Sequence, residues 1–115
     1  MYKRQVYLPC VHDIHQDHGT VSAEGIRAFK NVSILGYEMP WNNLTFDTSG
    51  FVVLSETDIR KKADAMNEYG SQVSRAYTSR EFLHCLARTR GTQIGAEYAE
   101  AFQVIRWVRA EHEAM

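Results

Sequence analysis

The sequence predicts an α/β fold, and two observations support this prediction. The first is the order of the elements: an apolar, strand-like run at residues 6–10, a helical pattern at 20–30 and a second apolar run at 32–38. Such an order predicts a βαβ crossover with parallel strands. The second is a polar cluster between the first strand and the helix, where residues 12–18 hold three histidines and two aspartates. Because sites in open α/β sheets form in loops at the carboxyl ends of strands, we expect a functional site in this loop.

Each further element is expected from its pattern of apolar residues and from the residues that end it. The first helix should end at Asn31 and bury three residues that lie roughly on one face: Val21, Ile26 and Phe29. Later in the chain we expect an apolar segment at 51–54, a helix from 56 to about 69, a helix from 80 to near 91 and a strand at 99–108. Residues 55–58 and 78–81 are each typical of a capping box, which favours a helix start at both places.

Composition limits the classes of function. Apolar residues make up 44% of the 115 residues, which is enough to form the core of one small domain. The formal net charge is -1 and no basic stripe occurs, so a nucleic-acid partner is not expected. The two cysteines, Cys10 and Cys85, lack the spacing of a disulfide scaffold, which favours a reducing, cytoplasmic compartment. No apolar run is long enough to span a membrane.

The first five residues are excluded from the fold prediction. The tetrapeptide Tyr2-Lys3-Arg4-Gln5 matches one reading frame of a common transposon-based sequencing adapter, and the chain opens inside a strand-like run. We therefore expect the native sequence to begin near Val6, with residues 6–115 belonging to one domain.

The polar cluster allows two interpretations from its residues alone. His12, His15 and His18 are spaced three residues apart, and imidazoles with carboxylates bind zinc or act as an acid/base pair. One interpretation is a metal-binding loop, and the other is a polar loop whose histidines cap a helix or face solvent. Four further residues are expected to be ordinary helix, tail or surface residues: His84, His112, Glu97 and Glu100.

The residues of this loop also resemble a known family. His15-Gln16-Asp17-His18 is similar to the His-x-Asp-His motif of the LmbE-like (PIG-L) N-acetylglucosaminyl deacetylases, and Asp13 extends the likeness to Asp-x-His-x-Asp-His. Three later segments are similar to the family in the same order: Tyr69-Gly70-Ser71-Gln72, Arg90-Gly91 and Tyr98-Ala99-Glu100-Ala101-Phe102. The resemblance covers residues 6 to about 108 and implies the C-terminal half of an LmbE-like domain, a Rossmann-like three-layer sandwich.

The resemblance implies a zinc-dependent enzyme that hydrolyses the acetamide of an N-acetylated sugar or glycoconjugate. His18 would bind zinc or another divalent metal, which would activate the water that attacks the acetamide carbonyl. His15 and Asp17 would be catalytic: the first stabilises or protonates the tetrahedral oxyanion, and the second orients an imidazole, a usual role beside a metal ligand. Asp13 and Glu100 are expected to bind the substrate.

One family motif is missing from the sequence. The other zinc ligands and the general base of these enzymes lie in a His-Pro-Asp-Asp motif near the N-terminus, and no segment here matches it. We therefore expect the chain to be the C-terminal part of a deacetylase, inactive alone and, with half of its sheet uncovered, prone to form a homo-oligomer. Two rival functions stay open: a complete metal- or sugar-binding module that uses His12 as a further ligand, and a structural or interaction domain.

Overall fold

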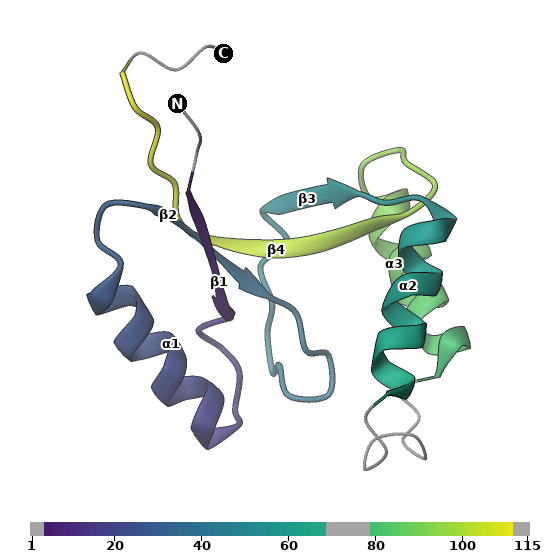
Figure 1. Cartoon of the computed structure of the whole chain (residues 1–115), viewed down its shortest axis with the longest axis horizontal. Coiled ribbons are helices and arrows are strands. Elements are labelled where there is room, and N and C mark those ends of the chain that lie inside the picture. The colour runs from purple at the N-terminus through teal and green to yellow at the C-terminus, as the bar shows by residue number, and fades with distance from the viewer. Residues whose placement is uncertain (1–3, 69–78, 112–115) are drawn as a thin grey trace. The chain divides into compact units, whose positions relative to one another are not determined.

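A computed structural model describes residues 4–68 and 79–111 of the chain. The described strands form a mixed four-stranded sheet in the order β1-β2-β4-β3, and three described helices accompany it (Figure 1). The predicted α/β class is therefore confirmed. The chain divides into two units, Met1–Gly50 with Ala101–Met115 and Phe51–Glu100.

The first unit begins with the predicted βαβ crossover. Strand β1 (Gln5–Pro9) leads through the polar loop into helix α1 (Gln16–Ala28), and the chain returns as strand β2 (Ser33–Tyr37). β1 and β2 pair in parallel, as the order of the elements predicts. Strand β4 (Ala99–Arg106) pairs with β2 in the antiparallel direction, which makes the sheet mixed. The polar loop therefore follows β1 at the carboxyl end of a parallel pair.

Helix α1 begins at Gln16, four residues before the helical pattern that the sequence shows from residue 20. The reason is a side-chain cap. His15 has extended backbone angles, and its Nδ1 accepts the backbone N–H of Asp17 at 3.2 Å. His15 is therefore the N-cap residue, and His18 lies in the first turn of the helix rather than before it.

The buried face of α1 also differs from the predicted one. Val21 and Phe29 are 50% and 44% exposed, whereas Ser22 and Gly25 are buried. A Cβ added at Gly25 would lie 2.6 Å from Cδ1 of Leu8, so the leucine of β1 fills the space that the glycine leaves. Small residues therefore form the face of α1 that packs against β1. The spacing of large apolar residues does not indicate such a face.

A glycine in β2 lets the start of the polar loop lie against the sheet. A Cβ added at Gly36 would lie 2.8 Å from Cα of Cys10, which is itself 1% exposed. The N–H of Cys10 donates to the carbonyl oxygen of Tyr37 at 3.3 Å, so the pairing of the two strands continues past the end of β1. This close approach requires a residue without a side chain at position 36.

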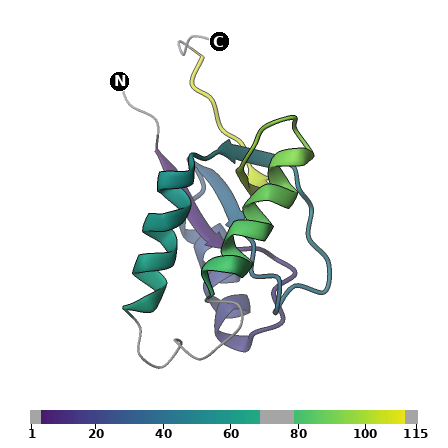
Figure 2. The same ribbon diagram turned by 90° about the vertical axis from the view of Figure 1, so that its right-hand side faces the viewer.

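The second unit contains two helices, α2 (Glu56–Asn67) and α3 (Arg80–Thr92), which lie side by side (Figure 2). It also contains most of strand β3 (Gly50–Val53) and the first residues of β4. The predicted capping box of α2 is confirmed. Ser55 Oγ accepts the N–H of Asp58 at 3.2 Å, and the Asp58 carboxylate accepts the N–H of Ser55 at 2.9 Å. The hydrogen bonds from Ser55 lower the pKa of Asp58, because they favour its ionised form.

Helix α3 starts and ends close to its predicted bounds. Ser79 is its N-cap residue, and its hydroxyl accepts the N–H of Phe82 at 3.0 Å. The helix continues through Gly91 to Thr92, slightly past the predicted end. Gly95, between α3 and β4, has a φ of 72°, a left-handed conformation that favours glycine.

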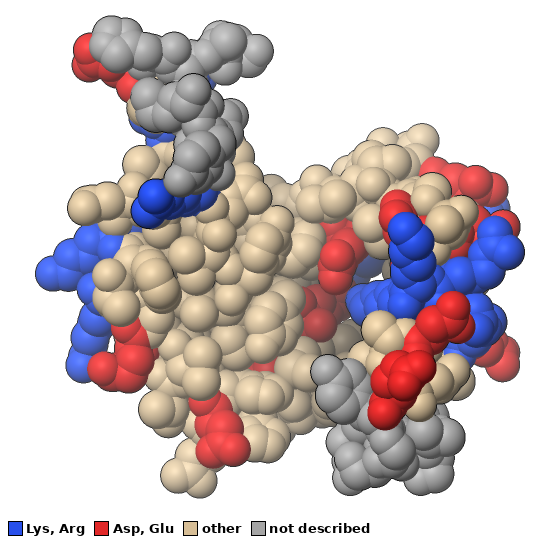
Figure 3. Space-filling model, viewed as in Figure 1, with Lys and Arg blue, Asp and Glu red and all other residues tan. Residues whose placement is uncertain are grey.

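Charged side chains of both signs are interspersed over α2 on the face shown in Figure 3. Several of them pair within the second unit: Nζ of Lys62 lies 3.5 Å from Oε2 of Glu100, and Nη2 of Arg80 lies 2.7 Å from Oδ1 of Asp64. Among the helices in the described part of the chain, none is long and apolar enough to cross a membrane.

Gly36→Ala should destabilise the chain, because the added methyl group would collide with the backbone of Cys10; overpacking of this kind typically costs ~1–3 kcal/mol. Gly19→Ala in α1 is the matched control. Nothing lies within 4 Å of a Cβ built at Gly19. The same change there should therefore raise the free energy of unfolding by up to ~1 kcal/mol. Denaturant unfolding of both variants measures the two effects, and equal effects would contradict the close approach.

Candidate functional site

The polar loop is held at its start by a buried side chain of β4. Gln103 is 8% exposed, and its Oε1 accepts the backbone N–H of Val11 at 3.0 Å. The preceding residue, Cys10, is buried against β2. The loop therefore leaves the sheet in a defined direction, follows β1 and enters α1, as the sequence predicts.

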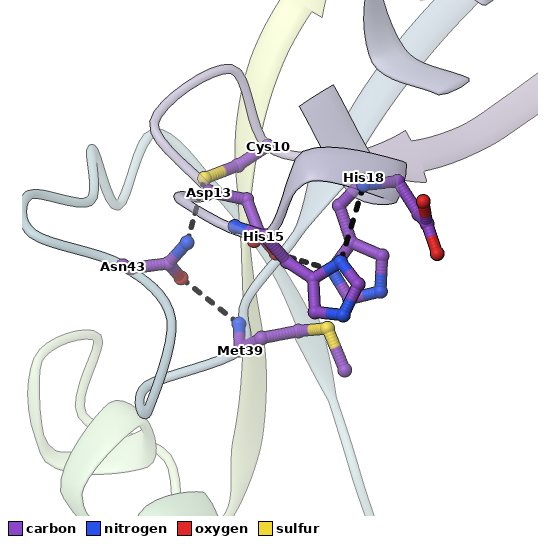
Figure 4. A network of polar contacts seen from close by, with 7 residues as sticks. Cys10, Asp13, His15, His18, Met39 and Asn43 are labelled. Carbon is purple, nitrogen blue, oxygen red and sulfur yellow. Dashed lines mark hydrogen bonds and ion pairs between the residues drawn. The ribbon is translucent and has the colours of Figure 1, made fainter. Parts of the chain in front are cut away.

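Asp13 is the centre of the candidate site, and its side chain is 0% exposed. Its Oδ2 lies 2.8 Å from Nδ1 of His18, and its Oδ1 accepts the backbone N–H of His15 at 2.8 Å (Figure 4). Both carboxylate oxygens are thus used inside the loop. A single carboxylate holds the N-cap residue of α1 and an imidazole from the first turn of the same helix.

The hydrogen bonds place the protons of the two imidazoles on different nitrogens. A carboxylate only accepts hydrogen bonds, so neutral His18 donates from Nδ1 to Asp13 and keeps a lone pair on Nε2. Nδ1 of His15 accepts the N–H of Asp17, so its ring proton is on Nε2. The two rings are stacked, with centroids 4.4 Å apart. The pair therefore offers one nitrogen that can bind a metal and one N–H that can donate to an oxygen.

The loop after β2 joins the polar loop through Asn43. Asp13 and Asn43 form an antiparallel bridge. The Asn43 side chain accepts the N–H of Met39 at 2.9 Å and donates to Sγ of Cys10 at 3.1 Å (Figure 4). Asn43 was not among the predicted site residues. Its position in the sequence is the one signal that could have indicated it. Asn43 follows the second strand of the parallel pair, so it lies at the same edge of the sheet as the polar loop.

Two groups near Asp13 stay protonated at neutral pH. Burial raises the pKa of the Cys10 thiol, and the negative charge of Asp13 adds to the rise. Burial also raises the pKa of the Tyr37 phenol, with the same carboxylate as the second cause. Since the thiolate, not the thiol, is the reactive form, the raised pKa does not favour Cys10 as a nucleophile.

Three other predicted residues have partners of their own. Asp17 is exposed in the first turn of α1, where its backbone N–H makes the cap described above. The imidazole of His12 lies 3.9 Å from the carboxylate of Asp47. Glu100 belongs to the second unit, where its carboxylate pairs with Lys62. Within residues 4–68 and 79–111, no three His, Cys, Asp or Glu residues are grouped so that they could hold a metal.

His84, expected to be an ordinary helix residue, belongs to a polar cluster of the second unit. Its Nε2 lies 3.1 Å from the hydroxyl of Tyr98 and 3.3 Å from Oε1 of Glu56. Tyr98 is buried, and its ring packs edge-on against the imidazole with centroids 4.9 Å apart. The cluster joins α2, α3 and the segment that enters β4, and it gives a buried phenol the hydrogen-bond partner that burial requires.

No protein-family model and no curated protein sequence matches this chain. The resemblance to the LmbE-like deacetylases therefore stays a prediction that depends on the motif residues. Three of the predicted features lie outside the described residues: Tyr69-Gly70-Ser71-Gln72, Thr78 and His112. Of the motif residues that are described, the structure brings together Asp13, His15 and His18.

Asn43→Ala should destabilise the chain, because Met39 loses the acceptor of its N–H and Cys10 loses its amide donor. The lost hydrogen bonds predict a decrease of ~1–3 kcal/mol in the free energy of unfolding. Asn42→Ala is the matched control, since the described contacts of Asn42 are made by its backbone. Denaturant unfolding compares the two variants, and an equally large decrease for Asn42→Ala would show that the amide of Asn43 has no special role.

Proposed function

We propose that the chain carries part of the active site of a zinc-dependent N-deacetylase, within an LmbE-like, Rossmann-like domain. The substrate is an N-acetylglucosaminyl compound, whose acetamide is hydrolysed to acetate and an amine. One observation supports the proposal most strongly: the rings of His15 and His18 are stacked, and their hydrogen bonds favour opposite tautomers, one with an N–H on Nε2 and the other with a lone pair there. These are the two chemical properties that the resemblance requires of them.

His18 fits the role of a zinc ligand. Metal-binding histidines usually donate their other ring N–H to a carboxylate, and His18 does so to Asp13 at 2.8 Å. The His18 side chain is 25% exposed, which leaves it accessible to a metal. A catalytic zinc typically has three protein ligands and a water. The resemblance implies that the others belong to a segment with the His-Pro-Asp-Asp motif; within residues 4–68 and 79–111, no three His, Cys, Asp or Glu residues are grouped so that they could hold a metal.

The residues of this chain would act on the acetamide carbonyl. Zinc, when bound, supplies the Lewis acid that activates water and polarises the carbonyl. His15 would donate its Nε2–H to the carbonyl oxygen as that oxygen gains negative charge during the attack of water. The backbone N–H of Asp17 keeps the proton of His15 on Nε2, where it can be donated. The carbon–nitrogen bond would then break, and the nitrogen would leave as an amine after it takes up the proton that the attacking water gave to the general base of the His-Pro-Asp-Asp motif.

The proposal predicts zinc-dependent release of acetate when a segment that carries His-Pro-Asp-Asp is joined to this chain. The chain alone should be inactive on an N-acetylglucosamine derivative, because its described residues group no three metal ligands and its sequence has no His-Pro-Asp-Asp motif to supply the general base, which typically contributes ~10²–10⁴-fold. In the joined protein, His18→Ala should abolish the release of acetate, and so should removal of zinc with a chelator.

His12→Ala in the joined protein is the matched control, because its imidazole lies beside Asp47 rather than Asp13. This variant should keep most of the activity. His15→Ala should lower the rate by about 10²–10³-fold, as expected for the loss of one donor to an oxyanion. Robust release of acetate by the chain alone, or full activity in His18→Ala, would contradict the proposal.

A further inference from the structure

We infer that Asp13 is the positioning residue of His18: its buried carboxylate holds the imidazole in the tautomer that leaves Nε2 free for a ligand. The inference rests on the proposed function for the role of His18, and it extends that function by naming the residue on which the ligand depends. The resemblance alone would assign the orientation of an imidazole to Asp17 and would place Asp13 beside the substrate.

The contacts of the two aspartates favour Asp13. Its carboxylate is 0% exposed and lies 2.8 Å from Nδ1 of His18. Asp17 is exposed, and its described contact with an imidazole is made by its backbone N–H, to His15. A hydrogen bond to an ionised group is strong, and surroundings of low dielectric strengthen it further, so the buried carboxylate determines the tautomer. The same burial leaves no oxygen of Asp13 exposed for a substrate.

Contacts other than the one with His18 fix the position of Asp13, so the carboxylate determines the orientation of the imidazole and not the reverse. Its Oδ1 accepts the N–H of His15 at 2.8 Å, and its backbone N–H donates to the carbonyl oxygen of Cys10 at 3.2 Å. The next residue, Ile14, donates its N–H to the carbonyl oxygen of Asn42 at 2.9 Å. The carboxylate is therefore oriented by the loops before any ligand binds, which is the condition for a preorganised site.

Asp13→Asn reverses the hydrogen-bonding character of one atom while it keeps the shape of the side chain. The amide oxygen should keep the N–H of His15, because an amide nitrogen cannot accept it. The amide NH₂ group then faces Nδ1 of His18, which must accept a hydrogen bond, so the ring proton moves to Nε2. We therefore expect this variant to stay folded and to lose the free lone pair on Nε2 of His18.

Nitrogen-15 NMR of the imidazole rings reads the tautomer directly. The spectra are recorded on the metal-free chain, at a pH above the ordinary range of histidine titration. In Asp13→Asn, Nε2 of His18 should change from the unprotonated to the protonated type of signal, and Nδ1 should change in the opposite direction. Asp17→Asn is the matched control and should leave both signals unchanged. In the joined protein, Asp13→Asn should weaken zinc binding by ~10–100-fold.

The two readouts separate this inference from the proposed function. If the tautomer changes in Asp13→Asn but the joined protein releases no acetate, the positioning role is supported and the proposed function fails. An unchanged His18 in folded Asp13→Asn, or the same change in Asp17→Asn, would overturn the inference. If Asp13→Asn does not fold, the inference is tested on the unmodified chain instead. Its His18 Nδ1–H should exchange slowly with water because it is bonded to a buried carboxylate, and fast exchange would overturn the inference.

Discussion

The arrangement of the candidate site depends on one buried carboxylate. Burying an ionised carboxylate is costly unless its oxygens are hydrogen-bonded, and both oxygens of Asp13 are. This requirement places the N-cap residue and the first-turn imidazole of α1 within reach of a single side chain. The start of the helix, the direction of the His15 backbone and the tautomer of His18 are therefore consequences of the same constraint.

The sheet holds the loop that carries Asp13, and three of its strands contribute. Cys10 follows β1 and lies against β2 because Gly36 has no side chain. Gln103 of β4 accepts the N–H of Val11, and Asn43, in the loop after β2, donates to Cys10. The site is thus supported by regular elements on both sides of its loop, which favours a fixed geometry over one that a ligand would have to induce.

Local patterns in the sequence were sufficient to predict the elements and the position of the site loop. The strands were apolar runs, and Ser55 began α2 through a capping box. The buried face of α1 could not be predicted from apolar spacing, since Ser22 and Gly25 form it. The partner of His18 could not be predicted either, because Asp17 directly precedes His18 whereas Asp13 lies five residues before it, and spacing alone does not favour the more distant carboxylate. Burial distinguishes the two aspartates, and burial arises from contacts between segments far apart in the chain, such as the bond between Asn43 and Cys10.

The central claim is that two stacked imidazoles carry their protons on opposite nitrogens before any ligand binds. Nitrogen-15 NMR of the unmodified, metal-free chain measures the protonation of both rings in one experiment. We predict a protonated Nε2 for His15 and a protonated Nδ1 for His18, each with its other ring nitrogen unprotonated. The same tautomer in both rings, or a neutral His18 protonated on Nε2, would contradict the claim.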